Sequence, residues 1–289
     1  QVKFTKIPSN YLKKTIENRE NIEVVISSDN NEDKLENRTI NKHFTVYTAF
    51  YDFLVRNDYL KVNPVDIKYL KEESETKKEE FEYQEIKDLF KVKSKGRAKD
   101  PDEEVHNIFK FAYLTGMRIG EILSLKIEDI EILDGTRIID IKQAKNRTSI
   151  RLIPTNKDID EILETQAKKS KNGYLFIDYH LKNRHSPKAN PIGKRLNLRI
   201  KNYLNEKGKD SSIKSFHSFR KNFAQTLYLE RFNIKEQTIS KLMGHTTKDN
   251  ITRKIYNRNK VEREALIRAM NCIKLSDIDE LIKEDIYFE

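Results

Sequence analysis

Apolar side chains recur every three to four residues in several stretches of this chain, which is the spacing of one helix face. The clearest early stripe starts after Arg38 and consists of Ile40, Phe44, Tyr47, Phe50, Tyr51 and Leu54. We expect this helix to pack into a small helical bundle, together with an earlier helix around residues 11–26. Aromatic stripes at this spacing are more often core than platforms for base stacking.

The helical pattern stops at Asn63-Pro64, and the next stretch cannot contribute to a core. Residues 68–82 are nearly all charged or polar. Such composition is typical of an exposed, solvated segment. We therefore interpret residues 71–80 as a linker between a helical domain at residues 1–70 and a second domain at residues 81–289.

The second domain shows helical spacing with two short β-branched runs. Strands are predicted at residues 138–141 and 149–153, forming a hairpin with residues 144–147 as its turn. Helices are predicted at residues 81–90, 103–114, 119–125, 158–166, 194–206 and 259–273. The predicted fold class is mainly α with a small β-sheet, in two domains.

The end of the chain forms an amphipathic tail, at about residues 274–289. Leu275, Ile278, Leu281 and Ile282 share one side of the predicted helix. Packing on its own domain is the plain interpretation of this tail.

Composition narrows the classes of partner. The chain has 289 residues, too many for one ordinary core, and a net charge of +10. This balance favours a nucleic-acid partner, with a charge-rich solubilising surface as the alternative. A single cysteine, Cys272, excludes a disulfide framework and a Cys-rich zinc site, and no metal or cofactor is implied.

Targeting and membrane signals are not evident in the sequence. The longest apolar runs span only a few residues, and no signal-peptide pattern is seen at the start, so we expect a soluble, cytoplasmic protein without membrane contact. The chain begins at Gln1 rather than Met. This start suggests a fragment, and whether an additional N-terminal module precedes it stays open.

Candidate chemistry lies in four short motifs. They are Thr115-Gly-Met-Arg-Ile-Gly-Glu121, His217-Ser-Phe-Arg220, Leu242-Met-Gly-His245 and Ile255-Tyr256, with Gln143-Ala-Lys145 between the first two. Each has a plainer interpretation: Glu121 caps a helix, His217 and Arg220 form a solvated pair, Gly244-His245 ends a helix, and Tyr256 is a buried ring.

Together these side chains suit strand cleavage at a phosphodiester. Transfer of the phosphate to a tyrosine conserves the bond energy, so the strand can be resealed without a nucleotide cofactor. Without a metal, negative charge on the non-bridging oxygens needs guanidinium and imidazole donors. The leaving 5′-oxygen needs a proton, which a lysine in a hairpin turn can deliver.

Taken in this order, the motifs resemble those of the tyrosine recombinase (integrase) family. The resemblance covers the second half of the chain in detail, and residues 39–64 more loosely. By that similarity, Tyr256 is the nucleophile of a 3′-phosphotyrosyl link, Arg118 and Arg220 clamp the phosphate, and Lys145 is the general acid. His217 then assists proton transfer at the nucleophile, and His245 binds the scissile phosphate.

Two positions depart from the family pattern or stay ambiguous. His245 and Tyr256 are eleven residues apart, a slightly longer spacing than the family suggests, although Tyr256 is the only tyrosine between His245 and Tyr287. Lys142 also flanks the predicted turn and remains an alternative to Lys145.

The resemblance implies a helical core-binding domain and an α/β catalytic domain that clamp double-stranded DNA. It further implies a homotetramer on two recombination sites, strand exchange through a Holliday junction, and docking of the tail on a neighbouring protomer. An accessory DNA-bending or directionality factor is compatible with this scheme, as is nucleoid association in a bacterium.

The function expected is integration or excision of a mobile element, such as a phage or transposon. A Xer-type recombinase that resolves chromosome dimers is the nearest alternative. A type IB topoisomerase and a DNA-binding module with a decayed site are the remaining classes. Basic clusters at residues 93–99, 184–188 and 194–201 are candidate phosphate contacts.

Overall fold

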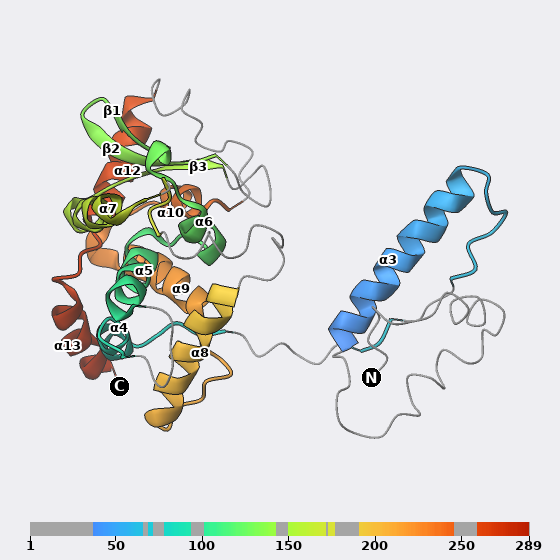
Figure 1. Ribbon diagram of the computed structural model, residues 1–289, viewed down its shortest axis with the longest axis horizontal. Coiled ribbons are helices and arrows are strands. Elements are labelled where there is room, and N and C mark those ends of the chain that lie inside the picture. Colours follow the sequence, from blue (N-terminus) through green and yellow to red (C-terminus); the bar gives the residue numbers. More distant parts are fainter. Residues whose placement is uncertain are drawn as a thin grey trace. The chain divides into compact units, whose positions relative to one another are not determined.

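The computed structural model describes residues 37–65, 69–71, 78–93, 101–142, 150–171, 173–176, 191–245 and 259–288 (Figure 1). The chain divides into two compact units, Gln1–Glu75 and Thr76–Glu289. The boundary falls within the segment 71–80 that the sequence analysis interprets as a linker. The helix expected around residues 11–26 lies outside the described residues.

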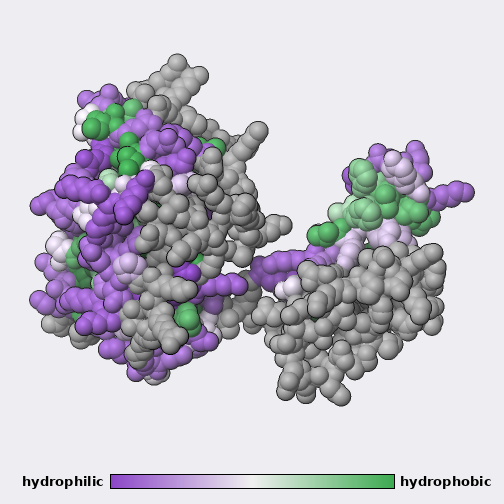
Figure 2. Space-filling model, in the orientation of Figure 1, coloured by the Kyte–Doolittle hydropathy of each residue, from purple (hydrophilic) through white to green (hydrophobic). Residues whose placement is uncertain are grey.

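The first unit contains the predicted long helix, α3 (Asn37–Arg56). Asn41 is buried and joins α3 to the chain at Leu70, because its side-chain amide donates to the Leu70 carbonyl and its oxygen accepts from the Leu70 amide, each at 2.9 Å. Phe44 is buried, but Phe50 is 54% exposed, contrary to the packing expected for that ring. Figure 2 shows apolar residues at the surface of this unit.

The second unit is mainly helical with one small sheet, as predicted. Its first elements are α4 (Tyr83–Leu89), α5 (Asp102–Thr115), α6 (Ile119–Ser124), β1 (Ile130–Leu133), β2 (Thr136–Ile141) and β3 (Arg151–Pro154). Its later helices are α7 (Lys157–Lys169), α8 (Pro191–Glu206), α9 (Phe216–Tyr228), α10 (Glu236–Met243), α12 (Lys260–Asn271) and α13 (Ile278–Phe288). Short 3-10 turns, Ile127–Asp129 and Glu230–Phe232, precede β1 and α10.

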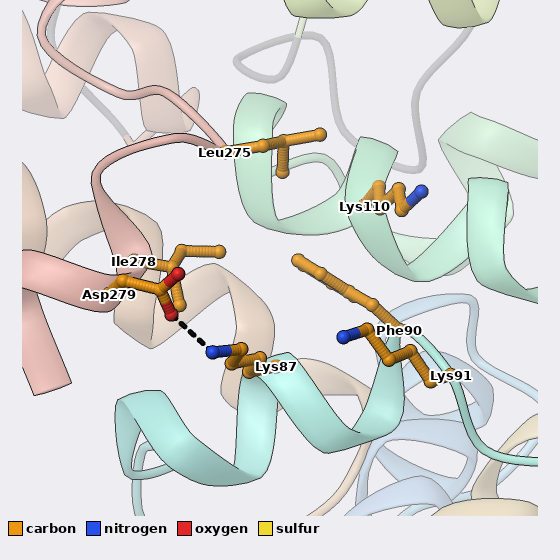
Figure 3. Close-up of a pocket in the computed structure, with 7 residues that line it drawn as sticks. All are labelled: Lys87, Phe90, Lys91, Lys110, Leu275, Ile278 and Asp279. Atoms are coloured by element: carbon orange, nitrogen blue, oxygen red, sulfur yellow. Dashed lines mark hydrogen bonds and ion pairs between the residues drawn. The ribbon is translucent and has the colours of Figure 1, made fainter.

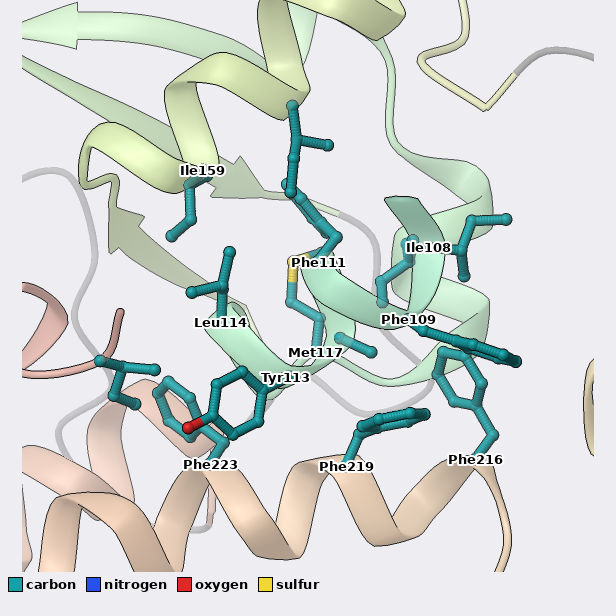
Figure 4. Close-up of a cluster of buried hydrophobic side chains, with 14 of the residues drawn as sticks. Ile108, Phe109, Phe111, Tyr113, Leu114, Met117, Ile159, Phe216, Phe219 and Phe223 are labelled. Atoms are coloured by element: carbon teal, nitrogen blue, oxygen red, sulfur yellow. The ribbon is translucent and has the colours of Figure 1, made fainter. Parts of the chain in front are cut away.

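The core is centred on the contact between α5 and α9. Phenylalanines at positions 216, 219 and 223 of α9 recur at helical spacing and face α5, where Phe109 and Tyr113 meet them (Figure 4). The rings of Phe109 and Phe219 have their centroids 5.3 Å apart. This contact with α5 fixes α9 along its length. The polar residues of α9 that lie between the buried rings therefore take defined positions.

The sheet has three antiparallel strands in the order β1-β2-β3. The predicted pairing of the second and third strands is confirmed, with Ile139 opposite Ile153. The strand β1 is not among the predicted strands. The sequence nevertheless indicates this strand, because Asp134-Gly135 lies between alternating apolar positions and an Asp-Gly pair is typical of a hairpin turn. The predicted turn at residues 144–147 lies outside the described residues.

The chain entering the second unit is fastened to α9. The Phe81 amide donates to the side-chain oxygen of Asn222 at 2.9 Å, and the Asn222 amide donates to the Phe81 carbonyl at 2.6 Å. Just before this, the Glu79 amide donates to the Ile213 carbonyl at 2.7 Å. Residues 79–81 are therefore tied to the second unit.

The C-terminal helix α13 packs on α4 of the same chain. Ile278 and Leu281 are buried there, and the Lys87 ammonium lies 2.5 Å from a carboxylate oxygen of Asp279. A small pocket remains between the two helices, with Phe90, Leu275 and Ile278 along its apolar side (Figure 3). The amphipathic pattern predicted for this tail is thus satisfied within the single chain.

Candidate active site

A tight turn between α5 and α6 positions the first candidate arginine. Gly116 ends α5 in the left-handed conformation with φ of 60°, and Arg118 is the N-cap of α6. A Cβ at Gly116 would lie 2.5 Å from Cδ1 of Phe223, so glycine is required both by φ and by space. The turn therefore sits directly on α9.

Arg118 is held by Glu121 but stays accessible. Its backbone amide donates to Oε2 of Glu121 at 3.0 Å, and its Nη1 donates to Oε1 at 2.9 Å. The Arg118 side chain is 39% exposed. The plain interpretation of Glu121 as a helix cap is correct, and the same carboxylate also orients the arginine.

Glu121 also binds a second arginine, Arg151 of β3, which is not among the predicted site residues. It is 1% exposed, and its Nη2 and Nη1 donate to the two carboxylate oxygens of Glu121 at 2.9 and 3.3 Å. Its Nε donates to the Leu242 carbonyl at 2.7 Å. From the sequence, Arg151 was predicted only to lie in a strand. The sequence does contain a sign of this role, because Arg151 stands between the apolar residues Ile150 and Leu152-Ile153 of a predicted strand. A charge buried in such a strand needs a partner.

Glu121 is thus shared by two guanidinium groups. Burial alone raises the pKa of its carboxyl, but the hydrogen bonds and charges of Arg151 and Arg118 outweigh burial and lower that pKa below its usual value. Glu121 is therefore ionised at neutral pH.

Arg220 of α9 lies beneath the turns that end α5 and α10. It is buried, its Nη1 donates to the Gly116 carbonyl at 2.6 Å, and its Nη2 donates to the Met243 carbonyl. Burial and the nearby charges of Arg151 and Arg118 lower the pKa of Arg220 to about 9, so the guanidinium is still charged at neutral pH.

The two candidate histidines lie beside these arginines. His217 is one turn before Arg220 on α9, and His245 follows Gly244, which ends α10 in the left-handed conformation. Both side chains keep exposed surface. Even so, partial desolvation and then the charges of Arg220 and Arg118 lower the pKa of each imidazole. The structure therefore brings Arg118, His217, Arg220 and His245 into one positively charged cluster.

The remaining two candidates, Lys145 and Tyr256, lie outside the described residues. The alternative lysine, Lys142, follows β2 and is 3.5 Å from carboxylate oxygens of both Asp129 and Glu131. The choice between Lys142 and Lys145 stays a prediction. So does the role of Tyr256.

One candidate DNA contact is corrected by the structure. Arg199 is buried, and its Nη1 donates to a carboxylate oxygen of Asp102 at 2.8 Å. It therefore joins α8 to α5 instead of presenting a free charge to a phosphate. Lys194 and Lys201 of α8 are exposed. Residues 94–99 and 184–188 lie outside the described part of the chain.

Neither a metal centre nor a membrane-spanning helix is found in the described part of the chain. Among the described residues, no group of three or more His, Cys, Asp or Glu side chains is arranged to hold a metal ion. Across the same residues, no helix is both long and apolar enough to cross a membrane.

Comparison with known proteins identifies the family. The sequence profile of the phage integrase family matches residues 79–263, which include all six candidate positions. Tyrosine recombinase XerC of Bacillus subtilis is 30% identical over 114 residues, covering 39% of this chain and 36% of that protein. Tyrosine recombinase XerA of Pyrococcus furiosus is 32% identical, covering 64% of this chain and 60% of that protein. The matched segments thus span less than two thirds of either relative.

Solved structures agree at the level of the fold. The Tn1549 transposon integrase in complex with circular intermediate DNA aligns with a TM-score of 0.54 and 19% identity, covering 74% of this chain and 73% of that one. The profile match spans well over half of the chain, and the mainly helical fold with a small sheet agrees with it. The chain belongs to the phage integrase family of tyrosine recombinases.

Proposed function

We propose that this protein is a site-specific DNA recombinase that integrates or excises a mobile element. The observation that carries the proposal is the cluster of Arg118, Arg220, His217 and His245, built where the turns at Gly116 and Gly244 meet α9. A concentration of positive charge and imidazole donors is what a phosphoryl-transfer transition state requires. The net charge of +10 supports a DNA partner.

The proposed reaction is a transesterification at phosphorus. The Tyr256 phenol oxygen attacks the scissile phosphate, forming a 3′-phosphotyrosyl bond as the bond to the 5′-oxygen breaks. Lys145 donates a proton to that leaving oxygen, and Lys142 is the alternative donor. Attack by a 5′-hydroxyl of the partner strand reverses the step, so no external energy source is consumed.

The described residues suit their proposed roles. Arg118 keeps exposed surface, and a guanidinium has five N–H donors, so Arg220 retains donors after serving two carbonyls. In the proposed mechanism, Arg118 and Arg220 bind the non-bridging oxygens of the phosphate, and His245 donates a further hydrogen bond to it. The lowered pKa of His217 leaves its imidazole neutral at pH 7, ready to take the phenol proton.

We further propose that strands are exchanged in a homotetramer on two DNA sites, through a Holliday junction. In that assembly α13 leaves α4 of its own chain and docks on α4 of a neighbour, burying the same side chains, Ile278 and Leu281. An accessory DNA-bending or directionality factor fits this scheme. We also propose that the protein acts in the bacterial cytoplasm, on the nucleoid, because its proposed substrate is genomic DNA.

A second candidate is resolution of chromosome dimers, because the sequence relatives are named XerC and XerA. The two roles differ in the DNA sites used. Covalent cleavage at the ends of an adjoining mobile element supports the first role, whereas cleavage confined to a chromosomal site outside any mobile element supports the second.

The test is a nicked suicide duplex that carries a candidate site, with products resolved on a denaturing gel. The wild type should give a covalent protein–DNA band that Tyr256→Phe abolishes. Tyr228→Phe is the matched control, because Tyr228 is exposed on α9 outside the cluster, and it should cleave normally.

Three results would contradict the proposal. A band retained by Tyr256→Phe means that another residue is the nucleophile. Relaxation of supercoiled DNA without a sequence requirement indicates a type IB topoisomerase. Tight, sequence-specific binding without any covalent band indicates a DNA-binding module.

A further inference from the structure

We propose that Arg151 is a positioning residue for DNA cleavage, acting through Glu121 on Arg118 and through the end of α10 on His245. This inference rests on the proposed recombinase function. It assigns a role to a residue of β3 that faces away from solvent and that none of the motifs contains.

The contacts of Arg151 reach two parts of the chain outside its own strand. Its Nη1 and Nη2 donate to Glu121 of α6, and its Nε donates to the Leu242 carbonyl in the last turn of α10. A single planar guanidinium thus fixes the distance between the strand, the Arg118 turn and the α10 end. The five donors of arginine have a fixed geometry that lysine does not reproduce.

Gly244 shows how closely this side chain supports the turn before His245. A Cβ on Gly244 would lie 3.0 Å from Nη1 and 3.1 Å from Cδ of Arg151. The turn therefore packs closely on the Arg151 side chain, and its left-handed φ of 61° favours glycine. Any shift of Arg151 changes the path of the backbone that presents His245.

Charge gives Arg151 a second effect on Arg118. Glu121 carries one negative charge, and both guanidinium groups share it. Without Arg151, the carboxylate would be neutralised by Arg118 alone, and that arginine would be drawn toward Glu121. With Arg151 present, the trio keeps a net charge of +1, available to a phosphate.

Stability alone does not account for a buried arginine at this position. Buried ion pairs commonly stabilise a fold no better than apolar residues of similar volume. The neighbours of Arg151 on β3, Leu152 and Ile153, are buried apolar residues. A methionine at position 151 would suit such a strand if packing were its only task.

The experiment compares Arg151→Met, Arg151→Lys and the control Arg137→Met. Arg137 lies on neighbouring β2 and pairs with Asp160 and Glu164 near the surface, outside the cluster. Each protein is assayed with suicide DNA at saturating protein, at a temperature where circular dichroism shows it folded. Dissociation constants for the same DNA are measured in parallel.

We expect Arg151→Met to cleave about 100-fold more slowly per folded molecule, with little change in DNA affinity, because misplaced groups lose that much in rate. Arg151→Lys should recover part of the rate by restoring charge, and Arg137→Met should match the wild type. A wild-type rate for folded Arg151→Met would overturn the proposal. If Arg151→Met does not fold, Arg151→Gln, which keeps a polar side chain near Glu121 and the Leu242 carbonyl but removes the charge and the fork of donors, is judged by the same criterion.

A second readout is independent of cleavage. In the DNA-free protein, Arg151→Met should move the imidazole resonances and raise the pKa of His245, with a smaller effect on His217, as followed by NMR. Unchanged His245 resonances would overturn the positioning role. If the wild type gives no covalent product but His245 responds, the proposed function fails while the structural link from Arg151 to His245 stands.

Discussion

Arg220 donates a 2.6 Å hydrogen bond from Nη1 to the carbonyl oxygen of Gly116, so a side chain of α9 holds the turn that leads to Arg118. Its other terminal nitrogen, Nη2, donates to the Met243 carbonyl, just before the turn that leads to His245. The position of one buried guanidinium therefore determines the separation of two other candidate phosphate ligands.

Replacement of Arg220 by lysine should impair cleavage more than folding. A lysine keeps the charge but cannot serve both carbonyls and the phosphate. We expect a loss of about 100-fold or more in the single-turnover cleavage rate, and about 1–2 kcal/mol in the free energy of unfolding. Arg231→Lys, at an exposed position after α9, is the control. Equal cleavage by both variants would show that Arg220 does not act at the phosphate.

Gly116→Ala should destabilise the second unit through a clash as well as through backbone strain. The new Cβ would meet the Phe223 ring, adding about 1–3 kcal/mol of overpacking to about 1–2 kcal/mol for a left-handed alanine. Gly208→Ala isolates the strain, because Gly208 also has positive φ but an added Cβ there would meet no atom within 4 Å. Urea denaturation of both variants measures the difference. Identical losses would mean that the Phe223 contact relaxes without cost.

Acid should destabilise the free protein through His217 and His245. Their pKa values are lowered by desolvation and by Arg220 and Arg118, so the unfolded chain binds protons at a higher pH than the folded chain does. The free energy of unfolding therefore falls as pH drops from the unfolded-state pKa of about 6.5 toward the lower folded-state values. Denaturation midpoints across this pH range measure the loss, and His217→Asn with His245→Asn should flatten the dependence.

Binding of DNA should raise the pKa of both imidazoles, because a phosphate between the arginines offsets their positive charge. Histidine NMR titrations with and without a duplex measure this change. If the two pKa values are unaffected by a tightly bound cognate duplex, the phosphate does not occupy the cluster.

Exchange of α13 between protomers can be tested by complementation. One chain carries Ile278→Asp and Leu281→Asp, which spoil the tail but leave the nucleophile, and the other carries Tyr256→Phe with an intact tail. Neither should yield much covalent product alone, but a mixture should, because an intact tail can dock on the chain that retains Tyr256. Glu280→Ala, on the exposed side of α13, controls for nonspecific effects. A mixture no more active than its parts would favour docking within one chain.

Local patterns predicted most of the fold. Helical spacing identified α5, α7, α8 and α12, because each buries one apolar stripe against a shared core. The strand β1 was missed, although the Asp134-Gly135 turn marks it, since none of its residues is buried and Glu131 interrupts its apolar run.

The site was predictable only in part, for a physical reason. Sequence motifs indicated Arg118, His217, Arg220 and His245, which the structure brings together. They did not indicate Arg151. Its proposed role depends on contacts with Glu121 and Leu242, which are distant in sequence and meet it only in the folded chain. They also suggested Arg199 as a phosphate contact, whereas its pairing with Asp102 is a tertiary contact.

The trio of Arg118, Glu121 and Arg151 also constrains how such a chain can diverge. Loss of Glu121 removes the carboxylate that both arginines share, and loss of Arg151 leaves the buried Glu121 paired only with the more exposed Arg118. Substitutions at positions 121 and 151 are therefore better tolerated together than singly. Across homologous chains, positions 121 and 151 should therefore covary, switching as a pair between ionic and uncharged combinations.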